Sequence, residues 1–195
     1  MALLINGVVY HRPLLVFALK EEAQDQFEDF ELLFTGVGKI NASYHLSKRL
    51  ALDRPDLVLN LGTAGSSKFE TGAVVNATAF VQRDMDVTGL GVPPYVTPFE
   101  SEGELLTYGL SISELESCVC GSGDNFETAH TSQLFDTVDM EAYALALISR
   151  KEKIPFLCLK FISDGANDKA ATDWKEALRL AAKSLSNILN QWKLT

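Results

Sequence analysis

Short runs of branched and aromatic residues recur along this chain, and several of them end in a glycine or polar turn. The clearest run, IPFLCLKFIS at 154–163, is followed by DGAND. Short runs that are apolar on both faces are typical of strands in a largely parallel sheet covered by helices on both sides. We therefore expect strands at 13–19, 31–36, 56–62, 73–81, 117–123 and 154–163.

Three segments with helical periodicity separate or follow these runs, at 40–54, 139–153 and 173–193. In the last one, Asp173 with Glu176 resembles an N-terminal capping pair. Its apolar stripe is formed by Trp174, Leu178, Ala181, Leu185, Leu189 and Trp192. The pattern predicts a three-layer α/β sandwich with a mixed, largely parallel sheet, as a single domain over 1–195. The proline-rich stretch 89–103 predicts a long loop of the kind that forms lids or binding surfaces.

The charge balance narrows the class of partner. The 195 residues contain 17 Lys and Arg against 26 Asp and Glu, which gives a net charge of −9. Such a chain repels nucleic acid and anionic membranes, so a small-molecule ligand is the better expectation. Three cysteines lie in apolar surroundings, and the apolar N-terminus lacks a basic region and is interrupted by polar residues and Pro13. These features predict reduced cysteines, no signal peptide and a cytoplasmic protein.

Generic motifs for nucleotides and metals fit poorly. The turn TGVGKIN at 35–41 matches neither the dinucleotide fingerprint nor the phosphate-binding loop, and no Gly-x-Ser-x-Gly motif occurs. His11, His45 and His130 are scattered without metal-ligand spacing, so no metal site is predicted.

Carboxylates, in contrast, gather at the expected ends of elements. Glu21 and Glu22 follow the first strand, Asp139 and Glu141 stand at the expected start of a helix, and Asp164 ends the last strand. Each one alone has a simpler explanation as a turn residue or as an acid at a helix N-terminus. Together, at strand ends that face one crevice, they indicate a site.

Seven segments carry a family resemblance: VFALKEEAQ, FTGVGKINA, NLGTAGS, RDMDVTG, CGSGDNF, VDMEAYALA and FISDGAND. In this order they resemble the 5'-methylthioadenosine/S-adenosylhomocysteine nucleosidases of the purine nucleoside phosphorylase superfamily. The resemblance runs from Pro13 to the C-terminal helix, although the segments 22–35 and 126–139 are shorter than usual. It implies hydrolysis of the N-glycosidic bond of 5'-modified adenine nucleosides, in nucleoside metabolism such as methionine salvage. It also implies no cofactor and a homodimer in which the loop at 90–100 lies near the partner.

The resemblance also implies roles for individual residues. Asp164 is expected to donate a proton toward N7 of the purine, with Ser163 orienting its carboxyl group. Glu22 is expected to position and deprotonate the attacking water, and Glu141 to bind the ribose hydroxyls. The expected remaining contacts with substrate come from Met140 under the sugar, Phe126 on the base, and Thr63, Ala64, Gly65 and Val37 in the glycine turns.

Two alternatives to a hydrolase stay open. A phosphorylase of the same superfamily would use phosphate in place of water, and a non-catalytic nucleoside-binding protein would retain only the fold. Negative charge on Glu21 and Glu22 disfavours phosphate, while Lys20, Lys39 and Arg83 are the cations that would compensate for it. The presence of acid and base together disfavours a protein that only binds.

Overall fold

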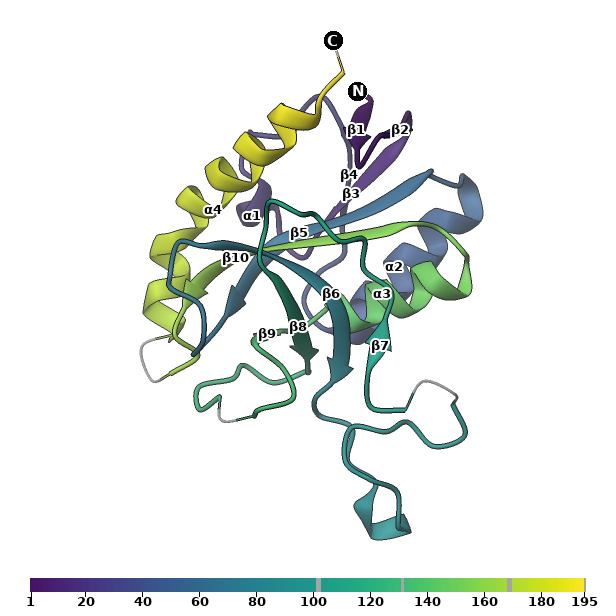
Figure 1. Cartoon of the computed structure of the whole chain (residues 1–195), viewed down its shortest axis with the longest axis vertical. Helices are drawn as coiled ribbons and strands as arrows, with labels where there is room; N and C mark the ends of the chain where they lie inside the picture. The colour runs from purple at the N-terminus through teal and green to yellow at the C-terminus, as the bar shows by residue number, and fades with distance from the viewer. Residues whose placement is uncertain (101–102, 131, 168–169, 195) are drawn as a thin grey trace.

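The computed structural model describes residues 1–195 except 101–102, 131, 168–169 and 195, and Asp168 of the DGAND motif therefore lies outside the described residues. Figure 1 shows a curved sheet with helices on both sides. The elements in chain order are β1 Leu3–Ile5, β2 Val8–Tyr10, β3 Pro13–Phe17, α1 Lys20–Ala23, β4 Glu31–Phe34, α2 Lys39–Leu52, β5 Leu57–Gly65, β6 Val74–Gln82, the 3-10 turn η1 Thr88–Leu90, β7 Leu106–Thr107, β8 Ser117–Ser122, β9 Thr137–Asp139, α3 Ala142–Lys151, β10 Phe156–Asp164 and α4 Ala170–Trp192.

The large sheet has the strand order β10-β6-β8-β9-β5-β3-β4, with β7 paired to β6. Strand β10 also pairs with β5, so that β5, β10, β6, β8 and β9 form a closed ring. The pairs β4–β3, β3–β5, β5–β10, β6–β8 and β8–β9 are parallel, whereas β10–β6, β5–β9 and β6–β7 are antiparallel. The expected mixed, largely parallel sheet is confirmed.

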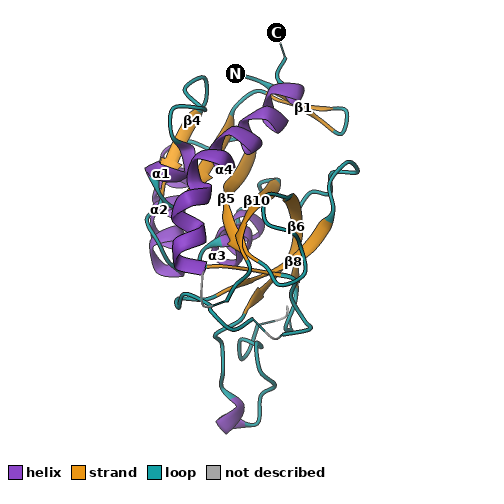
Figure 2. Ribbon diagram, turned by 90° about the vertical axis from the view of Figure 1, so that its left-hand side faces the viewer, coloured by secondary structure: helices purple, strands orange, loops and turns teal. Residues whose placement is uncertain are grey.

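The two larger of three hydrophobic clusters in the described residues cover the two faces of this sheet. Alternate residues of β10 divide between them: Cys158 and Ile162 belong to the core beneath α2 and α3, and Leu157 and Leu159 to the core beneath α4. Every residue of β10 is buried as a result, which is why its sequence is almost continuously apolar. Figure 2, turned by 90°, shows α4 running along the sheet, and it supplies Ala181, Leu185 and Leu189 to its core.

Six predicted strands correspond to β3, β4, β5, β6, β8 and β10, and three predicted helices correspond to α2, α3 and α4. A small hairpin, β1–β2, was not predicted from the sequence. It turns at Asn6 and Gly7, whose φ angles are 51° and 78°. An Asn-Gly pair between apolar residues favours this kind of two-residue turn, so the sequence did hold the signal.

Two predicted helix starts were wrong. Asp139 ends β9 instead of starting a helix, and its carboxylate accepts the backbone N–H of Ala142, where α3 begins, at 2.9 Å. Asp173 is not an N-cap, because α4 already begins at Ala170, whose N–H donates to the carbonyl of Asn167 at 2.9 Å. In both places the helix begins at the residue whose backbone N–H donates to an acceptor three residues earlier in the chain.

The predicted long loop is present and, in the described residues, contains one turn of 3-10 helix at Thr88–Leu90. It extends away from the sheet at the bottom of Figure 1. Phe99 is fully exposed there, but the ring of Tyr95 packs against Phe135 within the same chain at 6.2 Å between centroids. Part of the loop thus packs on its own chain, and Phe99 is left as an exposed apolar side chain.

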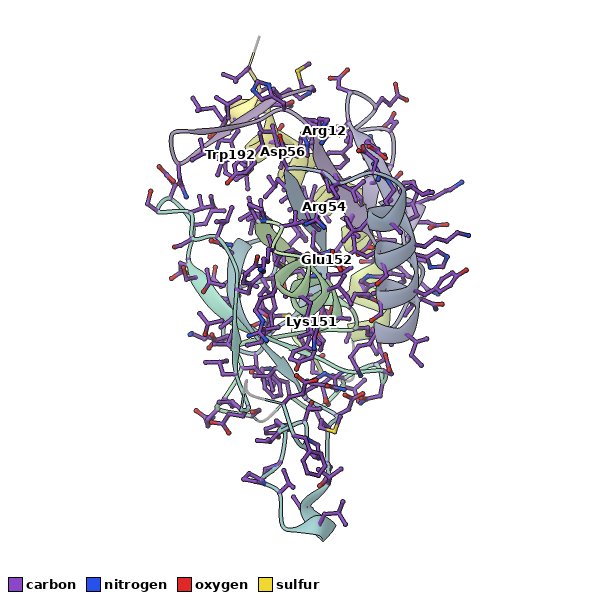
Figure 3. The ribbon with its side chains drawn as sticks, turned by 90° about the vertical axis from the view of Figure 1, so that its right-hand side faces the viewer. Arg12, Arg54, Asp56, Lys151, Glu152 and Trp192 are labelled. Atoms are coloured by element: carbon purple, nitrogen blue, oxygen red, sulfur yellow. The ribbon has the colours of Figure 1, made fainter. Side chains whose placement is uncertain are left out.

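Two exposed ion pairs connect segments that are far apart in the sequence. Arg54, after α2, pairs with Glu152, after α3, at 2.9 Å, and Arg12 pairs with Asp53 at 2.9 Å (Figure 3). The three cysteines are buried free thiols. None of the helices in the described part of the chain is long and apolar enough to cross a membrane.

Candidate active site

A cavity of about 180 Å³ lies where the strand ends converge. The structure brings all ten residues that the sequence suggested for a site to its wall, namely Glu22, Val37, Thr63, Ala64, Gly65, Phe126, Met140, Glu141, Ser163 and Asp164. Ala18, Leu19, Arg83, Asn125, Glu127, Val138, Asp139 and Trp174 complete the lining. Glu21, in contrast, is exposed and does not line the cavity.

Asp164 is the last residue of β10 and is almost completely buried. Its Oδ2 accepts the hydroxyl of Ser163 at 2.7 Å, and its Oδ1 accepts the N–H of Ala166 at 2.9 Å. Gly65 makes room for this carboxyl group, since a Cβ atom on Gly65 would lie 2.6 Å from Asp164 Oδ1. The carboxyl group is thus fixed in position at the cavity wall by two donors and one glycine.

Glu22 enters the cavity from α1, a single turn that follows β3. Its Oε2 accepts the backbone N–H groups of Ala18 and Leu19 at 3.2 and 3.1 Å. Its Oε1 accepts both the N–H and the hydroxyl of Thr63 at 3.0 Å. These four donors satisfy both oxygens of the buried Glu22 carboxyl group and fix it beside the cavity.

Glu141 occupies the N-cap position of α3, and its Oε1 accepts the N–H of Gly38 at 2.8 Å. Burial, reinforced by the negative charge of Asp139, raises the pKa of Glu141 to about 8. A group with this pKa retains its proton near neutral pH, so it can both donate and accept hydrogen bonds with a pair of hydroxyl groups.

A buried ion pair lies next to Glu141. Lys160 Nζ contacts Asp139 Oδ2 at 2.8 Å, and both side chains are almost fully buried. Although burial favours the neutral form of each, their mutual attraction holds the pKa of Asp139 below, and that of Lys160 well above, its ordinary value. Ser122 donates to the other oxygen of Asp139, which completes the network.

The segment that carries Phe126 is held by Arg83. The Arg83 guanidinium donates to the side chain of Asn125 at 2.9 Å and pairs with Glu127 at 3.3 Å. Lys39 pairs with both Asp84 and Asp124 just outside, at 2.6 and 3.1 Å. Phe126 is left half exposed at the cavity rim, where its ring can cover a planar ligand.

Sequence reasoning missed the roles of two residues. Trp174 was predicted to be part of an apolar helix stripe, but it lines the cavity, and its indole N–H donates to Thr63 Oγ1 at 2.9 Å. Lys160 was not singled out, although a lysine inside a run of buried strand residues is itself a signal, because a buried ammonium group needs a carboxylate partner. Among the described residues, no group of three or more His, Cys, Asp and Glu side chains is placed to hold a metal ion.

The sequence of this chain is similar to those of known proteins. The model of the phosphorylase superfamily matches residues 32–192. A 5'-methylthioadenosine/S-adenosylhomocysteine nucleosidase of Haemophilus influenzae (strain PittEE) is 32% identical over 183 aligned residues, covering 83% of this chain and 80% of the relative.

Solved structures agree on the fold. The 5'-methylthioadenosine/S-adenosylhomocysteine nucleosidase of Helicobacter pylori has a TM-score of 0.82 at 19% identity, covering 93% of this chain and 99% of its own. The futalosine hydrolase of Helicobacter pylori has a TM-score of 0.81 at 18% identity, covering 92% and 97%. Because enzymes named for different substrates share this fold, the fold alone does not choose the substrate. On the family model and the sequence identity, the chain belongs to the phosphorylase superfamily and, within it, to the family of the 5'-methylthioadenosine/S-adenosylhomocysteine nucleosidases.

Proposed function

We propose that this protein is a nucleoside N-ribohydrolase that cleaves the N-glycosidic bond of 5'-modified adenine nucleosides such as methylthioadenosine or S-adenosylhomocysteine. One observation carries the proposal beyond family membership: Glu22, Glu141 and Asp164 all line one cavity although they lie far apart in the sequence. A relative of 32% identity bears the name of this activity.

Each carboxyl group has a separate role in the proposed reaction. Asp164 donates a proton to N7 of the purine, so that the electron pair of the breaking C1'–N9 bond is accepted by the base. Water attacks C1' from the side of Glu22, which takes up the proton that the water loses. Glu141 binds the ribose hydroxyls through a carboxyl group whose pKa of about 8 lets it donate as well as accept.

The remaining lining residues hold the substrate. Phe126 stacks on the purine and Met140 packs beneath the sugar, while Val37 adds an apolar contact at the rim. Ser163 fixes the carboxyl group of Asp164 through the 2.7 Å hydrogen bond. Thr63 to Gly65, which end strand β5 rather than form the expected turn, lie next to the reacting carbon. No cofactor is required by these roles.

The test is a panel of adenosine analogues that differ at the 5' position, incubated with the protein, with products identified by mass. We expect free base and free pentose. Formation of pentose 1-phosphate would support the phosphorylase alternative. Tight binding of a nucleoside without any product would support the non-catalytic alternative.

We also propose that the protein works as a homodimer in the cytoplasm, in nucleoside metabolism such as methionine salvage. Exposed apolar side chains support an interface: Phe99 and Leu90 in the loop after β6, and Ile40 and Tyr44 on α2. Val37, which lines the cavity, precedes α2, so a partner seated on this surface would lie beside the site. Light scattering at micromolar concentration should give the mass of a dimer, and an active monomer would contradict the proposal.

A further inference from the structure

Of the four donors that hold Glu22, three are backbone N–H groups and cannot turn away. The fourth is the hydroxyl of Thr63, 3.0 Å from Glu22 Oε1, which rotates about its C–O bond. A hydroxyl has one proton and two lone pairs, so rotation decides whether Thr63 donates to Glu22 or into the cavity. The direction of this one proton is the adjustable part of the site.

Trp174 and Glu22 together limit that freedom. Trp174 Nε1 lies 2.9 Å from Thr63 Oγ1, and an indole N–H is a donor only, so the Thr63 hydroxyl accepts from it. Glu22 Oε1 is an acceptor, so the hydroxyl proton is directed to Glu22 and one lone pair is left facing the cavity. A contact across 111 positions of sequence thereby connects the first turns of α4 to a carboxylate on α1.

We propose that Trp174 is a positioning residue that orients the attacking water through Thr63, an inference that rests on the proposed hydrolase function. A water that donates one proton to Glu22 and the other to Thr63 Oγ1 turns its lone pairs toward the sugar. If Thr63 donated into the cavity instead, it would occupy a lone pair of that water and lower its nucleophilicity. Trp174 disfavours this second arrangement, because a hydroxyl that accepts a hydrogen bond donates more strongly to its own acceptor, here Glu22.

The kinetic test is a double-mutant cycle with methylthioadenosine as substrate. Trp174→Phe keeps a ring at the cavity wall but removes the donor, and we expect kcat to fall about tenfold, the effect of one hydrogen bond that matters in the transition state. In the Thr63→Val background the same change should alter kcat less than about twofold, whereas in the Thr63→Ser background the roughly tenfold loss should return. Changes in KM from the ring itself should be equal in all backgrounds.

An equal loss of kcat in the Thr63→Val background would overturn the inference, because Trp174 would then act without Thr63. A wild-type protein that releases no base from any nucleoside would instead contradict the proposed function, and this is seen before any variant is made.

A measurement without turnover covers the case in which a variant is inactive. The chain has two tryptophans, so Trp192→Phe leaves the indole N–H of Trp174 as the one such signal in an NMR spectrum. We expect Thr63→Val to move this resonance upfield, as loss of a hydrogen-bond acceptor does, and Thr63→Ser to leave it nearly in place. An unchanged resonance in Thr63→Val would show that the contact is not made in solution.

Discussion

Replacing Glu141 by Gln should make the protein more stable, and increasingly so as the pH rises. The Glu141 carboxyl group is buried with one hydrogen-bond donor, the N–H of Gly38. Burial first, and then the charge of Asp139, raises the pKa of Glu141 from 4.5 to about 8, although Lys160 acts in the opposite direction. Gln has the same shape, keeps an oxygen for Gly38 and carries no ionisable group.

The direction of this pH dependence follows from the number of protons that the folded and the unfolded protein bind. Between pH 4.5 and about 8, folded Glu141 keeps a proton that the unfolded chain releases, so the free energy of unfolding falls as the pH rises. The slope is at most about 1.4 kcal/mol per pH unit, and because it is smaller near pH 5 and near pH 8 the loss amounts to about 3.5 kcal/mol over this range. The Gln variant does not lose this stability, so the difference in the free energy of unfolding between the variant and the wild type should grow by up to that amount.

The assay is urea denaturation of both proteins at pH 5, 6, 7 and 8. Asp139 and Lys160 have pKa values displaced to lower and higher pH, outside this window, so they contribute equally to both proteins. Glu70→Gln, which removes an exposed carboxylate outside the cavity, is the matched control. Parallel stability curves for wild type and Glu141→Gln would refute the reasoning. A lower turnover in the stabilised variant would show that stability was given up for substrate binding.

Three further substitutions probe the same cavity. Asp164→Asn should leave the circular dichroism spectrum unchanged and lower kcat by about 10² to 10⁴, and a near-normal kcat would remove Asp164 from the mechanism. Gly65→Ala should lower kcat at least about tenfold, because the new Cβ would lie 2.6 Å from Asp164 Oδ1, whereas Gly89→Ala, with open space around it, should not. Lys160→Met should cost roughly 3 to 5 kcal/mol in urea denaturation by leaving Asp139 unpaired, against less than about 1 kcal/mol for Lys68→Met, whose own side chain is exposed. Equal costs for the two lysines would contradict the importance of burial.

The architecture could be predicted from the sequence because strands that are buried on both faces consist of short, nearly continuous apolar runs. β10 is buried on both faces, and its residues show this without any knowledge of its partners. The same holds for the strand ends that bring Glu22 and Asp164 to one cavity, since the ends of β3 and β10 can be recognised locally. Their roles came from the family resemblance and remain proposals.

What the sequence did not predict depends on contacts between distant elements. The Trp174 indole meets Thr63 only after α4 has packed on the sheet, and helical periodicity assigns that residue to the core stripe instead. Lys160 on β10 and Asp139 on β9 form their pair between two strands that are not hydrogen-bonded to each other in the sheet. Short elements were missed for a different reason: β7 and β9 have two and three residues, too few to show a period.

Water rather than phosphate should be the nucleophile, because of how charge is distributed around Glu22. A phosphate dianion in place of the water would stand beside this carboxylate, and two like charges about 4 Å apart cost roughly 4 kcal/mol at an effective dielectric constant near 20. Arg83 is the one cation among the described lining residues, and Glu127 already pairs with it at 3.3 Å.

Lys160 offers no compensation either, because Asp139 holds it at 2.8 Å. Lys39, the remaining cation near the turn before α2, is engaged by Asp84 and Asp124. We therefore expect the rate of base release from methylthioadenosine to stay constant as phosphate is raised from zero to millimolar concentrations, with sulfate as the ionic-strength control. A rate that rises with phosphate but not with sulfate would mean that the site binds the dianion, and the assignment of Glu22 as the base for water would fail with it.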